Sequence, residues 1–410
     1  MTSSNQGFRA NLELFKNRDF AVLWAGFTFS ALGDMIYYIA RIAVIMKLTG
    51  SALAVGGMSI FGLLPTVLMS LTGGALADRL NRQKLVVWSN VARGLIMVVL
   101  AGLIFSELIQ SWHLYVAAFM NNTFYAISNP AFDAMLPSVV ETDKLKNAYS
   151  LFSIGTNFAQ IAGPAIGGFL VLISGSGGAI FFNGMTFLCM MVALVFIRPK
   201  ISPLENSKRH SSIFSDIKDG WLYARKNNVI VIFFIAIAVF NLLSAFLILG
   251  GPFFITKTLK LDISWYGTMV VGINIGVILG GLLISSIQIQ RRGLLVCLSF
   301  IGVGLVMSII FSVTRSIWIA IFAMGLINLL LSFTNILMPA WIQTAVTDEY
   351  RGRVFSIMST MSLSLSPIGF AIAGLALDRF DPSLVISVAG LGILATGFWM
   401  FSKKDMRELR

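Results

Sequence analysis

The chain has 410 residues, of which 57% are hydrophobic and only 12% are charged. Soluble domains carry roughly 25% charged residues, so this chain has too little charge to cover a surface that faces water. The formal net charge of +12 would suggest nucleic acid as a partner of a soluble protein, but the basic residues here cluster between apolar runs. We therefore expect them to face a lipid bilayer, and we expect no nucleic-acid partner.

Side chains that could hold a metal or carry out catalysis are scarce. The two cysteines, Cys189 and Cys297, lie inside long apolar runs, which is typical of small buried side chains. The two histidines, His113 and His210, fall in polar connections. A membrane enzyme would need a nucleophile, a base or a metal cluster at membrane depth, and a nucleotide-driven pump would need a phosphate-binding G-x-x-x-x-G-K-[ST] loop. The sequence has no intramembrane histidine, one deep carboxylate and no such loop, so we expect no enzyme, no catalytic residue, no metal and no cofactor.

Apolar runs of about 20 residues recur along the chain, and a helix of that length crosses a hydrocarbon core of about 30 Å. The longest polar stretch, residues 198–227, separates two sets of six runs. They are residues 20–46, 52–76, 85–106, 112–136, 148–173 and 178–197, then 228–255, 265–288, 293–313, 317–340, 354–377 and 383–402. We expect an all-α membrane protein with twelve transmembrane helices in two pseudo-symmetric six-helix bundles.

The expected domains follow from these runs. They are a cytoplasmic N-terminal segment (1–19), an N-terminal bundle (20–197), a cytoplasmic linker (198–227), a C-terminal bundle (228–402) and a cytoplasmic tail (403–410). Of the 30 Lys and Arg residues, 23 lie in the two end segments, the linker and every second connection. Five lie on the opposite side, namely Lys47, Lys257, Lys260, Arg315 and Arg379. Because the cytoplasmic loops of membrane proteins carry an excess of Lys and Arg, we expect a multi-pass protein of the cell membrane with both termini cytoplasmic.

The first run, 20–46, contains a carboxyl group deep inside the predicted membrane helix. Asp34 lies about 21 Å along that helix from Phe20. Ser30, Tyr37 and Arg41 share its face, because they recur at helical spacing around it. A carboxyl in that setting should favour its neutral form, which suits a reversible proton carrier. The alternative is a structural hydrogen bond or ion pair with another helix, for which Arg41 and Arg93 are the possible charged partners.

The connection after the second run carries a recognisable motif. Residues 74–84 read G-A-L-A-D-R-L-N-R-Q-K, which resembles the signature loop G-x-L-A-D-R-x-G-R-(K/R)-x of the major facilitator superfamily. Asn81 replaces the usual Gly, and we expect it to tolerate a left-handed backbone at that point. The resemblance implies the major facilitator fold and a cytoplasmic gate. The gate residues it implies are Gly74, Asp78, Arg79, Arg82 and Asp133.

The resemblance also gives these residues roles. Asp78 would face the positive end of the helix that starts near Val354, and Arg79 would pair with Asp133. Such contacts would hold the cytoplasmic side closed. The alternative is a solvated basic loop that has no role in gating.

Further polar residues within the predicted helices are candidates for a substrate cavity. Arg93 lies about 12 Å into the run 85–106, whereas Arg41 is close enough to the outer interface to extend towards it. The neutral candidates are Asn121, Tyr125 and Asn129 in 112–136, then Asn241, Asn274, Asn328 and Asn335 in the second set of runs. A cavity with amides, aromatic rings and few charges suits large lipophilic molecules.

The run 148–173 is rich in small residues. Gly155, Gly163, Pro164, Gly167 and Gly168 resemble the motif associated with antiporters of the same superfamily. Small residues let two helices approach closely, so ordinary tight packing is the alternative interpretation. Pro164 has a counterpart in Pro367 of the second half, as expected if the two halves repeat one another.

Three other segments narrow the branch of the superfamily. Gly33–Asp34, Ser128–Ala131 and Arg351–Phe355 resemble the branch that holds macrolide-efflux proteins, the enterobactin exporter and lysophospholipid transporters. That resemblance implies secondary active transport by a monomer, with a small molecule and protons as its partners. We expect proton-coupled export of amphiphilic or lipophilic compounds, such as drugs, macrolides or siderophore-like metabolites, by an antiporter. A lysophospholipid flippase and an uptake permease are alternatives within transport, and a non-transporting membrane sensor is an alternative of another class.

Overall fold

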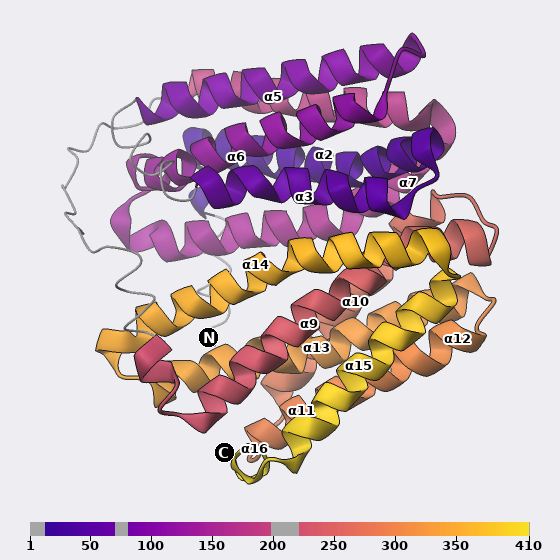
Figure 1. Ribbon diagram of the computed structural model, residues 1–410. Helices are drawn as coiled ribbons and strands as arrows, with labels where there is room; N and C mark the ends of the chain where they lie inside the picture. The colour runs from indigo at the N-terminus through magenta and orange to yellow at the C-terminus, as the bar shows by residue number, and fades with distance from the viewer. Residues whose placement is uncertain (1–12, 70–80, 198–220, 410) are drawn as a thin grey trace. The chain divides into compact units, whose positions relative to one another are not determined.

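The computed structural model describes residues 13–69, 81–197 and 221–409, which are helical almost throughout and contain no strand (Figure 1). Helices of the first half are α2 (Arg18–Thr49), α3 (Ala52–Met69), α5 (Arg82–Phe105), α6 (Ser111–Val139) and α7 (Leu145–Phe196), with a short turn η1 (Thr142–Lys144). The second half contains α9 (Asn228–Phe253), η2 (Phe254–Thr258), α10 (Trp265–Ser286), α11 (Arg292–Leu305), η3 (Val306–Ile310), α12 (Phe311–Val313), α13 (Ile317–Ala345), α14 (Asp348–Arg379), α15 (Pro382–Ser402) and α16 (Lys404–Arg407).

The long helices coincide with the predicted runs. Helix α7 covers both 148–173 and 178–197, and its helical geometry breaks at Gly175 (φ 69°, ψ 173°), between the two predicted helices. In the described part of the chain, eight helices are long and apolar enough to cross a membrane. Helices α3, α6 and α14 cover further predicted runs but are shorter or more polar. The membrane-helical fold class is therefore confirmed, and the count of twelve helices stays a prediction.

Asparagine side chains fix where several helices begin. The side-chain oxygen of Asn17 accepts hydrogen bonds from the backbone N–H groups of Asp19 and Phe20, at the start of α2. Asn81 accepts from the N–H of Lys84 at 3.0 Å and so caps α5. Its backbone is extended (φ −63°, ψ 113°), so this residue serves as a helix cap rather than in the left-handed conformation expected from the sequence.

The chain forms two compact units. One comprises Met1–Gly50 with Gly57–Asn206, and the other comprises Ser51–Gly56 with Ser207–Arg410. In the first unit, α2 packs mainly against α7, and α5 packs against α6 and α7. In the second unit, the main pairs are α10 with α13, α9 with α14, and α11 with α15.

The small residues of α7 lie where it meets α2. A Cβ atom at Gly167 would lie 3.0 Å from the Cα of Ile36, and one at Gly163 would overlap the side chain of Met35. Pro164 and Gly168 are buried beside them. These contacts show the close helix packing that we gave as the alternative for this motif. Its link with antiport stays a prediction.

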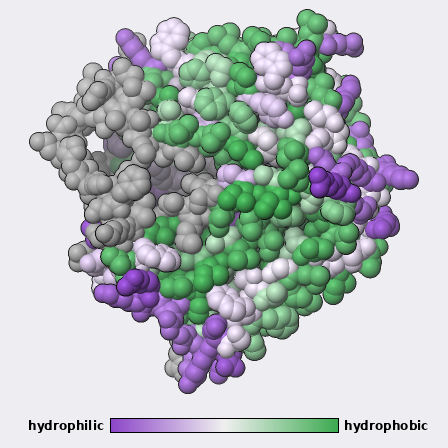
Figure 2. Space-filling model, viewed as in Figure 1, coloured by the Kyte–Doolittle hydropathy of each residue, from purple (hydrophilic) through white to green (hydrophobic). Residues whose placement is uncertain are grey.

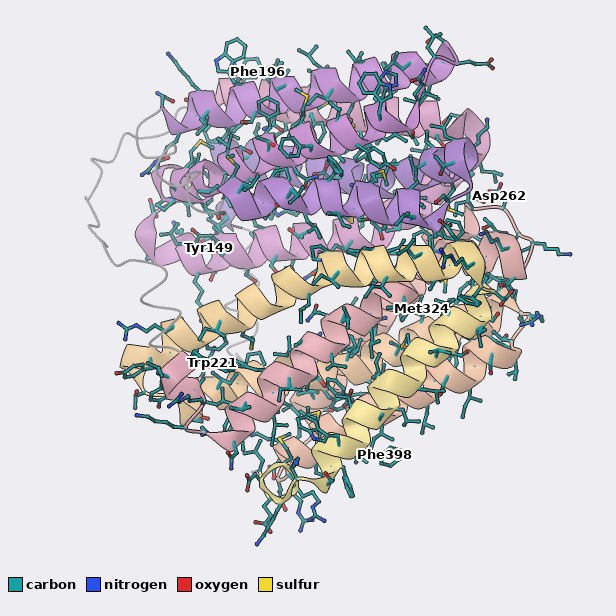
Figure 3. The ribbon with its side chains drawn as sticks, viewed as in Figure 1. Tyr149, Phe196, Trp221, Asp262, Met324 and Phe398 are labelled. Carbon is teal, nitrogen blue, oxygen red and sulfur yellow. The ribbon has the colours of Figure 1, made fainter. Side chains whose placement is uncertain are left out.

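The outward-facing side chains are largely apolar. Hydrophobic residues cover broad areas of the face in view (Figure 2). Phe196 at the end of α7 and Phe398 on α15 are 63% and 55% exposed, and both project away from their helices (Figure 3). So much exposed apolar surface would be unfavourable in water and is expected of helices that face lipid.

Candidate functional site

A cavity of about 360 Å³ lies among helices α2, α5, α6 and α7 of the first unit. All the first-half residues that the sequence marked for the proton and cavity sites line it. They are Ser30, Asp34, Tyr37, Arg41, Arg93, Asn121, Tyr125 and Asn129. The structure thus brings together residues from three predicted helices, and their role in transport stays a prediction.

Asp34 and Arg93 form an ion pair in this cavity. Nη2 of Arg93 lies 2.9 Å from Oδ1 and 3.0 Å from Oδ2 of Asp34. The side chain of Arg93 is 7% exposed and that of Asp34 is 27% exposed, so the pair is largely shielded from water. Asp34 therefore has, in Arg93, the charged partner that we gave as the alternative, and its role as a proton carrier stays a prediction.

Two further helices hold Arg93 in place. Its Nε donates a hydrogen bond to Oδ1 of Asn121 on α6 at 3.0 Å. Its guanidinium carbon lies 4.0 Å from the ring centre of Phe187 on α7 and 5.4 Å from that of Tyr125 on α6. A guanidinium over an aromatic face is stabilised by the negative face of the ring. One α5 side chain therefore links α2, α6 and α7.

The approach of α7 beside this ion pair depends on Gly33. A Cβ atom at this position would overlap Oγ1 of Thr186 and Oδ1 of Asn183, both buried on α7. The missing side chain lets α7 lie directly against α2, one residue before Asp34. This gives a physical reason for the pair Gly33–Asp34 that the sequence analysis singled out.

Arg41 lies elsewhere on the cavity wall, two helical turns after Asp34. Its guanidinium carbon is 5.6 Å from the ring centre of Tyr37 and 5.2 Å from that of Tyr38. The sequence suggested that Arg41 could extend to the membrane interface. The structure places it against two aromatic rings, and its reach towards the interface stays a prediction.

Aromatic rings close one part of the cavity. Phe27 of α2 stacks on Phe132 of α6, with ring centres 5.1 Å apart and planes 19° apart. Both rings meet Phe152 of α7 edge-on, at 5.0 and 5.5 Å. Phe27 and Phe132 line the cavity, so part of its wall is apolar and can accept a hydrophobic portion of a ligand.

Sequence reasoning missed three amides that also line this cavity, namely Asn90, Asn122 and Gln160. Asn90 lies three residues before Arg93, so helical spacing could have placed it on the same face. Gln160 is a polar residue within the apolar run 148–173, which is itself a signal. Asn122 gave no such signal, because it directly follows Asn121 and falls off the predicted face.

Two of the four asparagines predicted for a cavity in the second unit line one described here, and two do not. Asn241 and Asn335 line a smaller cavity of about 210 Å³. Asn274 and Asn328 each donate a hydrogen bond to the backbone carbonyl four residues earlier, at 2.9 Å. Neither of these two lines the cavities described here, and their role in a substrate site stays a prediction.

The predicted cytoplasmic gate falls mainly outside the described residues. Gly74, Asp78 and Arg79 all lie in the segment 70–80, which the structure does not describe. Arg82 is the first residue of α5, and its Nη1 donates a hydrogen bond at 3.0 Å to a backbone carbonyl of α6. That carbonyl belongs to Ala134. The side chain of the preceding residue, Asp133, is exposed. The gate contacts stay a prediction.

Comparison with known proteins agrees with this architecture. The family model described as transmembrane secretion effector matches residues 10–408. Macrolide efflux protein A of Streptococcus pyogenes is 26% identical over 95% of this chain and 97% of its own length. The enterobactin exporter EntS of Salmonella typhi is 23% identical over 87% of this chain and 82% of its own length.

Solved structures agree at the level of the fold. The nucleoside transporter NupG has a TM-score of 0.70 and 14% identity, over 94% of this chain and 100% of that one. The predicted superfamily and branch are confirmed by these matches, as is the expectation that the protein is not an enzyme. The chain belongs to the transmembrane secretion effector family of the major facilitator superfamily, a family of multi-pass membrane transporters.

Proposed function

We propose that the protein exports amphiphilic small molecules in exchange for protons, by alternating access. The observation that carries the proposal is the Asp34–Arg93 ion pair in the wall of a cavity that also holds amides and aromatic rings. A carboxylate at this depth can bind and release a proton, and the rings can hold an apolar compound. The relatives' names, macrolide efflux protein and enterobactin exporter, support the outward direction.

The ion pair suggests how proton uptake changes the protein. When Asp34 is ionised, its carboxylate ties α2 to α5 through Arg93. A proton on either carboxylate oxygen removes the negative charge and weakens that tie, while Arg93 keeps its contacts with Asn121 and Phe187. In the proposed cycle, protonation from outside and release to the cytoplasm alternately loosen and re-form the link. Substrate binding belongs to the step in which Asp34 has lost its proton.

Uptake into inverted membrane vesicles with an imposed pH gradient, acid inside, tests this proposal. A panel of fluorescent amphiphilic dyes should accumulate in vesicles with the unaltered protein, and an uncoupler should abolish the accumulation. Asp34→Asn carries no titratable group and should lose gradient-driven accumulation, while exchange of dye down its own gradient survives. The matched control is Asp262→Asn, an exposed carboxylate between α9 and α10 (Figure 3).

The outcomes are distinct. Dye accumulation that persists after an uncoupler has collapsed both the pH gradient and the membrane voltage would contradict proton coupling. Normal gradient-driven accumulation by Asp34→Asn would remove Asp34 from the mechanism. Net dye movement out of acid-loaded inverted vesicles, rather than into them, would favour uptake over export as the physiological direction.

A further inference from the structure

The charges of the first-unit cavity do not cancel. Among the residues that line it, three side chains carry a full charge, namely Asp34, Arg41 and Arg93. Asp34 is paired with Arg93 at 2.9 Å. Arg41 is left over, so the described cavity wall has one positive charge in excess.

Arg41 has no counter-charge of its own. No carboxylate lies within ion-pair distance of it in the residues that the structure describes. Its Nε is buried and lacks a hydrogen-bond partner among them. Asp34 is seven residues earlier on α2, about 10 Å along the helix axis, and both its oxygens face Arg93. The side chains of Tyr37 and Tyr38 lie beside the guanidinium, and neither carries a charge that could balance it.

Arg41 is partly buried, and a cation that lacks a counter-charge is costly to enclose within a membrane protein. The cost falls when an anion approaches, and a guanidinium binds carboxylate, sulfonate or phosphate groups with paired, charge-assisted hydrogen bonds. A cationic compound would instead meet repulsion from Arg41, and the only carboxylate on this wall is already bound by Arg93. The electrostatics of the wall therefore favour a negatively charged group near Arg41.

We propose that Arg41 binds an anionic group of the exported compound, so that the preferred substrates are amphiphilic anions or zwitterions. The apolar part of such a compound contacts the rings of Tyr37 and Tyr38, which line the cavity beside Arg41. This inference rests on the proposed function and names the substrate class of the same cavity. It also narrows the sequence-based expectation, which was of amphiphilic or lipophilic compounds, to compounds that carry a negatively charged group.

A pair of dyes with one shared skeleton tests the inference. Anilinonaphthalene sulfonate is an anion, and phenylnaphthylamine is its neutral parent. Binding of each dye to the full-length protein in lipid nanodiscs is measured by fluorescence, with the signal of empty nanodiscs subtracted. The unaltered protein should bind the anion about tenfold or more tightly than the neutral parent, as expected for a hydrogen-bonded charge. Arg41→Gln should lose this preference and keep its affinity for the neutral dye.

Two further variants separate the role of charge from that of folding. Arg41→Lys keeps the charge and should keep most of the preference for the anion. Lys47→Gln removes an exposed charge from the same helix and should behave as the unaltered protein. Equal affinity of the unaltered protein for the two dyes, or no saturable binding of the anionic one, would overturn the proposal. Neither result depends on the folding of a variant. An anion preference that survives in Arg41→Gln would also overturn it.

The binding assay is independent of transport. If the anion preference depends on Arg41 but no dye crosses the membrane under a pH gradient, the proposed function fails and the anion site stands. If gradient-driven export occurs with no difference between the dyes, the export function stands and the anion site fails. The two proposals can therefore fail separately.

Discussion

Replacing Asp34 by Asn should destabilise the protein through Arg93. Removing one member of a buried ion pair usually costs about 3–5 kcal/mol, because the other charge is left buried without a partner. Here Asp34 is 27% exposed, an Asn side chain keeps one acceptor oxygen, and Arg93 retains Asn121 and Phe187. These compensations lower our expected loss to about 2 kcal/mol in the free energy of unfolding.

A double-mutant cycle measures this interaction. The free energy of unfolding is obtained by titration with sodium dodecyl sulfate in mixed micelles, for the unaltered protein, Asp34→Asn, Arg93→Gln and the double variant. The double variant has no stranded charge, so its loss should be smaller than the sum of the two single losses by about 1–2 kcal/mol. Asp262→Asn is the control for a general effect of removing a carboxylate. It should lie within about 0.5 kcal/mol of the unaltered protein, because Asp262 is exposed.

Losses that simply add in the double variant would refute the ion pair as an energetic unit. The same set of variants also separates stability from coupling. The double variant should recover stability and still fail to accumulate dye under a pH gradient, because it has no carboxylate at position 34. Recovery of both properties would mean that Asp34 serves only to neutralise Arg93.

Two other predictions concern packing and orientation. Gly167→Ala should cost about 1–3 kcal/mol, measured by the same titration, because the new Cβ atom lies 3.0 Å from the Cα of Ile36. Gly102→Ala is the matched control, since nothing lies within 4 Å of its new Cβ atom, and it should be neutral or stabilising. Cysteines placed at residues 174–178 should react with an impermeant thiol reagent in intact cells, whereas cysteines in the linker 198–227 should not, in a background without native cysteines. Labelling of the linker in intact cells would overturn the cytoplasmic placement of the termini.

The helices could be predicted because their signals are local. Apolar length alone placed the runs 228–255 and 265–288, which the structure shows as α9 (with η2) and α10. The break in α7 at Gly175 fell inside the short connection expected between 173 and 178. The start of α5 was harder, because a single Asn can serve a left-handed turn or cap a helix, and only the fold shows that Asn81 does the second.

The sequence was enough to predict which residues line the cavity, but not which of its charged residues form an ion pair. Helical spacing put Asp34 and Arg41 on one face of α2, and polarity inside an apolar run marked Arg93. The contact between Asp34 and Arg93 joins residues 59 positions apart on separate helices, and no periodic pattern encodes which helices adjoin. The sequence therefore left Arg41 and Arg93 as competing partners, and three-dimensional packing selected Arg93.

The unequal charges of the cavity wall also bear on which force drives the proposed cycle. Each elementary charge that crosses the membrane is worth about 2.3 kcal/mol per 100 mV. When a neutral compound is exchanged for one proton, one positive charge enters the cell. When a monoanion held by Arg41 is exchanged for one proton, a negative charge also leaves, so two charges cross the membrane in each cycle. The membrane voltage then contributes about 5 kcal/mol per 100 mV to each cycle, even where the two sides have the same pH. An Arg in the cavity wall thereby favours cargo whose export moves two charges rather than one, and the membrane voltage can drive such export in a cell whose surroundings are not acidic.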